Sequence, residues 1–174
     1  MKTFILFATS ILAFNSFGQN IHPYFQYVGQ QVTETQIEEI LGSDYTKDGT
    51  TFKKDGITVR LDDYMYKRET PVLEIEEIWI SNAYLASKAN KENPFLGLTL
   101  KMTREECVAH LKTLLDFKEV TPGSGMYGEN IKAYYTGNPN APSYNGLYVF
   151  MRFEKGKKNK LYLSSITIKD RGKI

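Results

Sequence analysis

The chain has few of the residues that cross-link proteins, bind metals or carry acid–base chemistry near neutral pH. It contains one cysteine, Cys107, so no disulfide can form within it. Its two histidines, His22 and His110, are too few with that cysteine for a zinc site. We therefore expect no metal, no cofactor and a fold stabilised by packing.

An excess of charge of either sign is also lacking. The 174 residues include 22 basic and 20 acidic side chains, which leaves a formal net charge of +2. Such a balance provides no basic surface of the kind that binds nucleic acid. Nucleic acid is therefore not an expected partner.

The N-terminus has the pattern of a bacterial signal peptide. Lys2 precedes an apolar run over residues 4–14, and Ser16 and Gly18 are small residues at the −3 and −1 positions before Gln19. We expect residues 1–18 to be cleaved between Gly18 and Gln19, leaving a periplasmic or secreted protein. The run is shorter than the roughly 20 residues that span a bilayer. Residue 19 is not the cysteine of a lipoprotein, so no membrane anchor is expected after cleavage.

An internal similarity relates residues 28–80 to residues 96–168. Three blocks of similar pattern keep their order, at offsets of 68, 90 and 88 residues. The paired blocks are 28–40 with 96–108, 56–61 with 146–151, and 73–80 with 161–168. We therefore predict two tandem repeats, over residues 19–86 and 95–174, joined by a linker at 87–94.

Each repeat is predicted to begin with a capped helix. Thr35 with Glu38, and Thr103 with Glu106, have the T-x-x-E spacing of a capping box. Gly42 is a natural terminator for the first helix, and the second is expected to be longer. Apolar stripes are expected at Ile37, Ile40 and Leu41 in the first helix, and at Cys107, Val108, Leu111, Leu114 and Leu115 in the second.

The remaining blocks are typical of strands. Apolar residues alternate with polar ones at Ile57, Val59 and Leu61, and residues 147–153 are more uniformly apolar and aromatic. In residues 73–80 and 161–168 the apolar residues alternate with others, but they change once from odd-numbered to even-numbered positions. A β-bulge near Glu76-Glu77 and another near Ser164-Ser165 would return all the apolar residues to one face. The predicted fold is α+β, with each capped helix packed on an antiparallel sheet.

This combination resembles the SmpA/OmlA outer-membrane assembly lipoproteins and the tandem repeats of β-lactamase inhibitory proteins. The resemblance rests on residues 97–108 and their counterpart at 29–40. It implies a scaffold that presents a sheet surface to a protein partner rather than an enzyme. The chain lacks the lipid-bearing cysteine of the first group and the paired cysteines of the second, so no binding residue is transferred from either.

Two candidate chemical sites compete with simpler structural interpretations. Cys107 and His110 are close enough on a helix to form a nucleophile and its base, but Cys107 lies on the apolar stripe and is expected to be a buried hydrophobic residue. The carboxylates of Asp62-Asp63 and of Glu74, Glu76 and Glu77 could bind calcium, although they lack the spacing of a calcium loop. We interpret them as solvated strand faces and assign no catalytic residue.

The tyrosines are the best candidates for a recognition surface. Tyrosine combines a large apolar ring with a hydroxyl group, which suits binding surfaces, but it is also a common strand residue. We expect a non-catalytic protein-binding module that inhibits, confers immunity or assists assembly, with another protein of the cell envelope as its partner. A small envelope hydrolase or carbohydrate-binding domain is the alternative. The candidate binding residues are Tyr127, Tyr134, Tyr135, Tyr144 and Tyr148.

Overall fold

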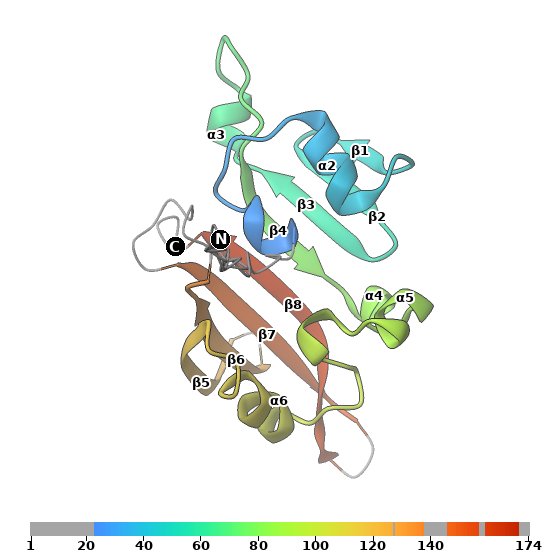
Figure 1. Cartoon of the computed structure of the whole chain (residues 1–174), viewed down its shortest axis with the longest axis vertical. Helices are drawn as coiled ribbons and strands as arrows, with labels where there is room; N and C mark the ends of the chain where they lie inside the picture. The colour runs from blue at the N-terminus through green and yellow to red at the C-terminus, as the bar shows by residue number, and fades with distance from the viewer. Residues whose placement is uncertain (1–22, 127, 138–145, 157–158, 171–174) are drawn as a thin grey trace, which may run out of the picture.

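The fold is built on one eight-stranded antiparallel sheet, as the computed structural model in Figure 1 shows. The structure describes residues 23–126, 128–137, 146–156 and 159–170; the predicted leader and its cleavage site lie outside these ranges. The strand order is β1-β2-β3-β4-β8-β7-β6-β5. The strands are β1 (Thr46–Asp48), β2 (Thr51–Lys54), β3 (Ile57–Leu61), β4 (Ile75–Ile80), β5 (Phe117–Gly125), β6 (Gly128–Tyr135), β7 (Leu147–Lys155) and β8 (Leu161–Asp170).

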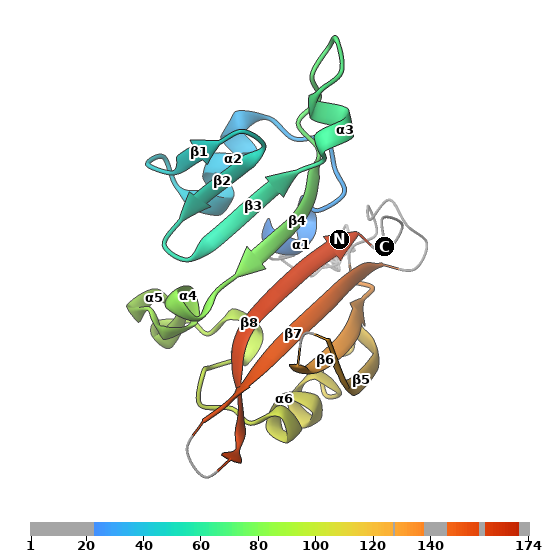
Figure 2. The same ribbon diagram turned by 180° about the vertical axis from the view of Figure 1, so that it is seen from behind.

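Helices accompany this sheet, so the predicted α+β class is confirmed. Helices α1, α2 and α6 lie against one face, and the view from behind shows the other face uncovered (Figures 1 and 2). In the part of the chain that the structure describes, no helix is long and apolar enough to cross a membrane. The helices are α1 (Pro23–Gln26), α2 (Glu34–Leu41), α3 (Asp63–Tyr66), α4 (Asn82–Ala86), α5 (Lys88–Glu92) and α6 (Arg104–Leu111), with a 3₁₀ turn, η1, at Phe95–Gly97.

Alternation along the strands places the core on the helix-covered face. In β3 the first, third and fifth residues are buried, as the sequence pattern predicted, and β7 alternates in the same way from Leu147 to Phe153. The central strands β4 and β8 pair through Ile78 with Ile168 and Ile80 with Ile166, and all four side chains are fully buried. The four strands β1–β4, called here the first half, and β5–β8, the second half, thus share one core.

Helix α2 begins two residues earlier than predicted. Its cap is Thr33, whose hydroxyl accepts a hydrogen bond from the Gln36 amide while the Gln36 side chain accepts one from the Thr33 amide. The expected box at Thr35 and Glu38 is wrong, because the Val32 amide bonds to the Leu73 carbonyl and the helix cap follows directly at Thr33. In a capping box the third residue of the helix can be glutamine or glutamate, and here it is Gln36.

Helix α6 has the predicted Thr103–Glu106 capping box but is not longer than α2; both have eight residues. It ends at Leu111, and Leu115 is 85% exposed rather than part of the apolar stripe. The Thr113 amide and hydroxyl both bond to the His110 carbonyl, which diverts that carbonyl from a continuing helix. The expected extension is therefore wrong.

Both predicted β-bulges are present. The pairing of β4 with β3 skips Glu76, and the pairing of β8 with β7 skips Ser164. In each strand the extra residue restores the apolar side chains beyond it to the core face. The flanking pairs are Arg60–Glu77 and Leu61–Ile75 in the first half, and Arg152–Ser165 and Phe153–Leu163 in the second.

Two short segments complete the core. In α1, the ring of Phe25 stacks on Tyr135 with centroids 4.1 Å apart and on Phe95 at 5.6 Å. Residues 87–94, expected as a linker, include α5, and the side chain of Asn90 there is fully buried. It donates to the carbonyls of Leu85 and Leu98 and accepts from the Phe95 amide. The segment between the two halves is therefore firmly anchored.

Candidate binding surface on the open face of the sheet

The face of the sheet opposite the helices, called here the open face, carries the candidate site. Along β7, Tyr148, Phe150 and Arg152 lie on this face because they alternate with four buried residues. Neighbouring strands add their own alternate residues in rows of directly opposed pairs. One row joins Lys132, Phe150, Thr167 and Trp79, the next joins Tyr134, Tyr148, Lys169 and Glu77, and a third joins Asn130, Arg152 and Ser165.

Four aromatic residues on this face, Tyr134, Tyr148, Phe150 and Trp79, are called here the aromatic strip, although Thr167 of β8 separates Trp79 from Phe150. The Tyr134 and Tyr148 rings lie 5.7 Å apart between centroids, and those of Tyr148 and Phe150 lie 6.2 Å apart and within 18° of parallel. Trp79, the only tryptophan in the sequence, is 42% exposed. Burial of the Tyr148 ring, together with the nearby Tyr134, raises the pKa of its hydroxyl, which stays protonated at neutral pH. The strip is therefore apolar and uncharged.

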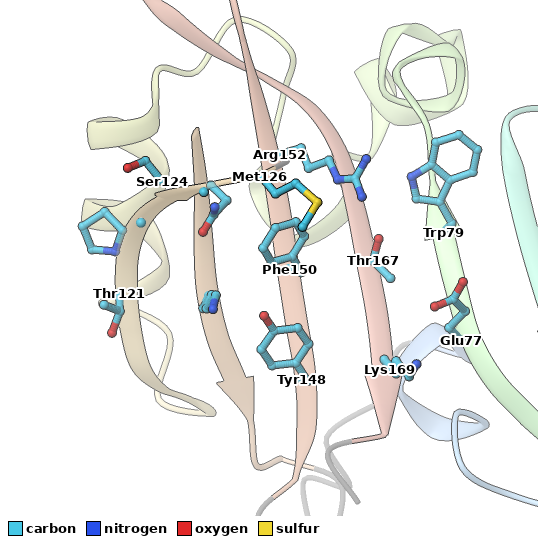
Figure 3. A pocket seen from close by; sticks show the side chains of 15 residues that line it. Glu77, Trp79, Thr121, Ser124, Met126, Tyr148, Phe150, Arg152, Thr167 and Lys169 are labelled. Carbon is cyan, nitrogen blue, oxygen red and sulfur yellow. The ribbon is translucent and has the colours of Figure 1, made fainter. Parts of the chain in front are cut away.

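A hollow of about 790 Å³ lies over Tyr148, Phe150 and Trp79 of this strip. Its floor is the sheet from β4 to β6, and one wall is the tip of the β5–β6 hairpin, including Ser124 and Met126 (Figure 3). The volume is within the range of roughly 300–1,000 Å³ that ligand-binding clefts occupy. The lining residues are Glu77, Trp79, Thr121, Pro122, Gly123, Ser124, Gly125, Met126, Asn130, Lys132, Tyr148, Phe150, Arg152, Thr167 and Lys169.

The hollow is predominantly basic. Its lining contains three cations, Lys132, Arg152 and Lys169, and one anion, Glu77. The Arg152 guanidinium lies 5.8 Å from the centroid of the Phe150 ring, within the range of a cation–π contact. Glu77 is an ion-pair partner of Arg60, at 3.3 Å between Oε1 and Nη1. Lys169 is likewise an ion-pair partner of Glu76, so the excess of cations in the lining rests on Lys132 and Arg152.

Next to the hollow, the open face of the first half carries a network of paired charges. The bulged Glu76 accepts from Arg60 at 3.1 Å and from Lys169 at 2.9 Å. Partial burial opposes ionisation of Glu76, but these two hydrogen bonds outweigh it and hold the pKa of the carboxyl below its usual value. The charges there are balanced within the protein.

Asn130 contributes an unsatisfied acceptor to the wall of the hollow. Its side chain is 5% exposed, and its amide nitrogen donates to the Gly128 carbonyl at 3.1 Å. Its Oδ1 is the only buried side-chain polar atom without a hydrogen-bond partner in the described ranges. A Cβ at position 123 would lie 2.9 Å from this oxygen, so a larger residue there would require the Asn130 side chain to shift. Buried polar atoms without partners are rare and costly.

The structure separates the five tyrosines that the sequence analysis selected. Tyr134 and Tyr148 lie on the open face, and Tyr148 lines the hollow. Tyr135 is 7% exposed and packs on Phe25 in the core, so it does not belong to this surface. Tyr127 and Tyr144 lie outside the described residues.

Sequence reasoning did not select Trp79 and Phe150 as binding residues. Both lie between fully buried residues of their strands, Ile78 and Ile80 in one case and Val149 and Met151 in the other. The alternation of residues along these strands could have identified them. A large aromatic residue at the positions that alternate with the buried ones lies on the solvent-facing side of the sheet.

The candidate chemical residues have structural roles. Cys107 is fully buried, and desolvation raises the pKa of its thiol to about 12, so it is not a nucleophile at neutral pH. The His110 Nε2 lies 2.7 Å from the Leu96 carbonyl oxygen. The Asp62 carboxylate accepts from the Tyr64 and Met65 amides and caps α3.

Comparison with known proteins adds no relative to this description. No protein-family model, curated protein or solved structure matches the chain. The open face is therefore interpreted from its own geometry and chemistry.

Proposed function

We propose that this chain is an exported, non-catalytic binding module whose open face, in the second half of the sheet, binds another protein of the cell envelope. The observation that carries the proposal is that Tyr148, Phe150 and Trp79 line a hollow on an uncovered sheet face. Such a module acts as an inhibitor, an immunity protein or an assembly factor.

The composition of the surface supports protein recognition. Tyrosine, tryptophan, phenylalanine, methionine and arginine are enriched in protein interfaces, and all five line this hollow. Residues that dominate binding energy are most often tryptophan, tyrosine and arginine in partly enclosed positions. Trp79, Tyr148 and Arg152 meet both conditions.

The pairing of the two halves supports a duplicated scaffold. The 88-residue offset of the sequence blocks matches Trp79 with Thr167 and Ile78 with Ile166. In the sheet, Trp79 pairs with Thr167, whereas Ile78 pairs with Ile168. This is the register expected if two copies of one unit met across a local two-fold axis between Trp79 and Thr167.

Site-specific photo-crosslinking tests the proposal. A photoreactive phenylalanine analogue replaces Ser124 at the wall of the hollow or, as the control, Thr113 beside α6, and each protein is mixed with envelope extract. We expect one adduct from position 124 and none from position 113. Unlabelled wild-type protein should suppress this adduct, and Phe150→Ala should not. Equal adducts from both positions, or suppression by both competitors, would contradict the proposal.

A carbohydrate-binding role is the alternative, and the nearly parallel rings of Tyr148 and Phe150 favour it. Two ring faces set side by side along a strand can form a platform for the apolar faces of sugar rings. Titration with a panel of glycan and peptidoglycan fragments tests this role. Saturable binding that Phe150→Ala abolishes, without a protein adduct, would replace the protein-binding proposal.

A further inference from the structure

Among the described residues, the most exposed thioether lies at the rim of the hollow. Met126 is 92% exposed and directly follows Gly125, which pairs with Gly128 at the end of the β5–β6 hairpin. It lines the hollow together with Phe150 and Arg152. Figure 3 shows its side chain extending from the hairpin tip toward these two residues. An apolar side chain is therefore held in solvent at the edge of the candidate binding surface.

Neither the hairpin nor the core accounts for a methionine at this position. Short hairpin turns favour glycine, asparagine and aspartate, whose backbones adopt the required conformations. The core gains nothing from a side chain that is almost fully in solvent. Methionine is, however, enriched where proteins bind one another, because its flexible thioether adapts to apolar surfaces. The position of Met126 thus suits a contact that a partner completes.

The other sulfur atoms of the described chain are less accessible to solvent. Cys107 and Met151 are fully buried. Met65 and Met102 are partly buried. Burial also raises the pKa of the Cys107 thiol to about 12, so its reactive thiolate is scarce at neutral pH. Because oxidation of sulfur follows exposure and, for cysteine, thiolate character, an oxidant in solution would reach Met126 first.

We propose that Met126 is an oxidation-sensitive switch of the open face. Hydrogen peroxide, or a related two-electron oxidant, converts its thioether to the sulfoxide and weakens binding of the partner, and reduction restores binding. This inference rests on the proposed function, because it concerns the regulation of the same surface. The export that we propose would place the side chain outside the reducing cytoplasm, where oxidising conditions prevail.

The reaction balances with peroxide as the only co-reactant. A lone pair of the Met126 sulfur attacks one peroxide oxygen, so that an S–O bond forms and the O–O bond breaks. The second oxygen leaves as water after it takes up the proton that the first oxygen gives up. Sulfur loses two electrons and peroxide gains them. Methionine sulfoxide reductases reverse the change with electrons from a dithiol.

Oxidation makes the side chain polar while it keeps its length. The sulfoxide oxygen is a hydrogen-bond acceptor on a group that was apolar. A partner that packs on the thioether and on Phe150 would then have to bury this oxygen, which costs free energy unless a donor reaches it. We expect an affinity loss of about tenfold, the order of the cost found when proteins bury a poorly partnered polar group.

Peptide mass spectrometry after treatment with hydrogen peroxide tests where oxidation occurs. In the folded mature protein we expect Met126 to be converted about tenfold faster than Met151, since the rate follows exposure. In urea the methionines should react at similar rates, which controls for effects of local sequence. Conversion of Met65 or Met102 as fast as Met126 in the folded protein would overturn the inference.

Competition for the position-124 crosslink tests the effect on binding. Peroxide-treated wild-type protein should compete about tenfold less well than untreated protein, and methionine sulfoxide reductase should restore competition. The control Met102→Leu should lose competition on oxidation as wild type does. The affinity of Met126→Leu, whatever its value, should not change on oxidation. Thermal unfolding confirms that each protein is folded before and after treatment.

The variant Met126→Gln supplies a readout without any oxidant. Its side chain is of similar length and has a polar end, so it should compete about as poorly as the oxidised wild type. If the adduct forms and the oxidised and untreated wild-type proteins compete equally, the open face binds a partner but Met126 does not regulate it. If no adduct forms from position 124, the proposed function fails and the switch fails with it.

Discussion

The two halves of the open face differ although each consists of four antiparallel strands. At positions matched by the 90-residue offset, the first half has Thr58 and Arg60 where the second has Tyr148 and Phe150. In the first half Arg60 is paired with carboxylates, whereas in the second the aromatic rings border a hollow. The same kind of backbone thus carries a balanced polar surface on one side and an apolar, basic one on the other.

The covered face shows no such divergence. Ile78 and Ile80 of β4 correspond to Ile166 and Ile168 of β8, and each is fully buried. Close packing leaves little freedom at these positions, because a change of even one methylene group affects neighbouring side chains. The difference between the halves is therefore concentrated where packing does not restrict the residues, and this is where we place the binding surface.

The largest expected effect comes from weakening the core at the β4–β8 pair, where the halves meet. Ile80→Ala should lower the free energy of unfolding by about 3 kcal/mol, because it leaves a cavity in the shared core. Urea unfolding should show one transition by both circular dichroism and Trp79 fluorescence. Two separate transitions would show that the halves unfold independently. Thr58→Ala on the open face should cost about 0.5 kcal/mol or less.

The second prediction removes the ring that most distinguishes the two halves. Phe150→Ala should weaken binding of the crosslinked partner by about 2 kcal/mol, since aromatic residues within a partly enclosed surface dominate interface energies. The matched change Arg60→Ala in the first half should weaken it by less than about 0.5 kcal/mol. Isothermal titration with the purified partner measures both. A larger loss from Arg60→Ala would move the binding surface to the first half.

A third prediction separates stability from binding at one buried residue. Asn130→Leu removes the unsatisfied Oδ1 together with the hydrogen bond to the Gly128 carbonyl. We expect the free energy of unfolding to stay within about 1 kcal/mol of wild type, because the two effects oppose each other. Affinity for the crosslinked partner should fall, because Asn130 lines the hollow. A large loss of stability with unchanged affinity would assign Asn130 a purely structural role.

The smallest effect concerns the bulged residues Glu76 and Ser164. Because the folded protein lowers the pKa of Glu76, its ionised form stabilises the fold above the unfolded pKa of about 4.3, and this contribution is lost as pH falls through the folded pKa. Glu76→Gln should therefore cost about 1 kcal/mol at pH 7 and almost nothing near pH 2. The effect of Ser164→Ala should not change with pH. Urea unfolding at each pH tests this difference.

Local patterns predicted much of the fold because they depend on neighbouring residues. The alternation at Ile57, Val59 and Leu61 and the phase slips at Glu76 and Ser164 identified strands and bulges without knowledge of their partners. The error at α2 arose because two neighbouring pairs, Thr33 with Gln36 and Thr35 with Glu38, both have the spacing of a capping box. The hydrogen bond from Val32 to Leu73 decides between them, and it joins residues that are distant in sequence.

The candidate site was harder to predict because it depends on long-range pairing. Tyr134 and Tyr148 were selected because they are tyrosines in a tyrosine-rich part of the sequence. Tyr135 was selected for the same reason, but its side chain faces the core. Trp79 reaches the hollow only because β4 lies beside β8, a pairing that no local pattern contains. Functions of Tyr127 and Tyr144 stay predictions.

The two outer strands of the sheet limit unwanted self-association. Exposed strand edges can recruit other chains into a growing sheet. Here β1 has only three residues, and β5 combines a register shift between Lys118 and Thr121 with Pro122, which has no amide hydrogen to donate. Both edges are poor templates for another strand. The uncovered face of the sheet can thus stay exposed without either edge inviting a further strand.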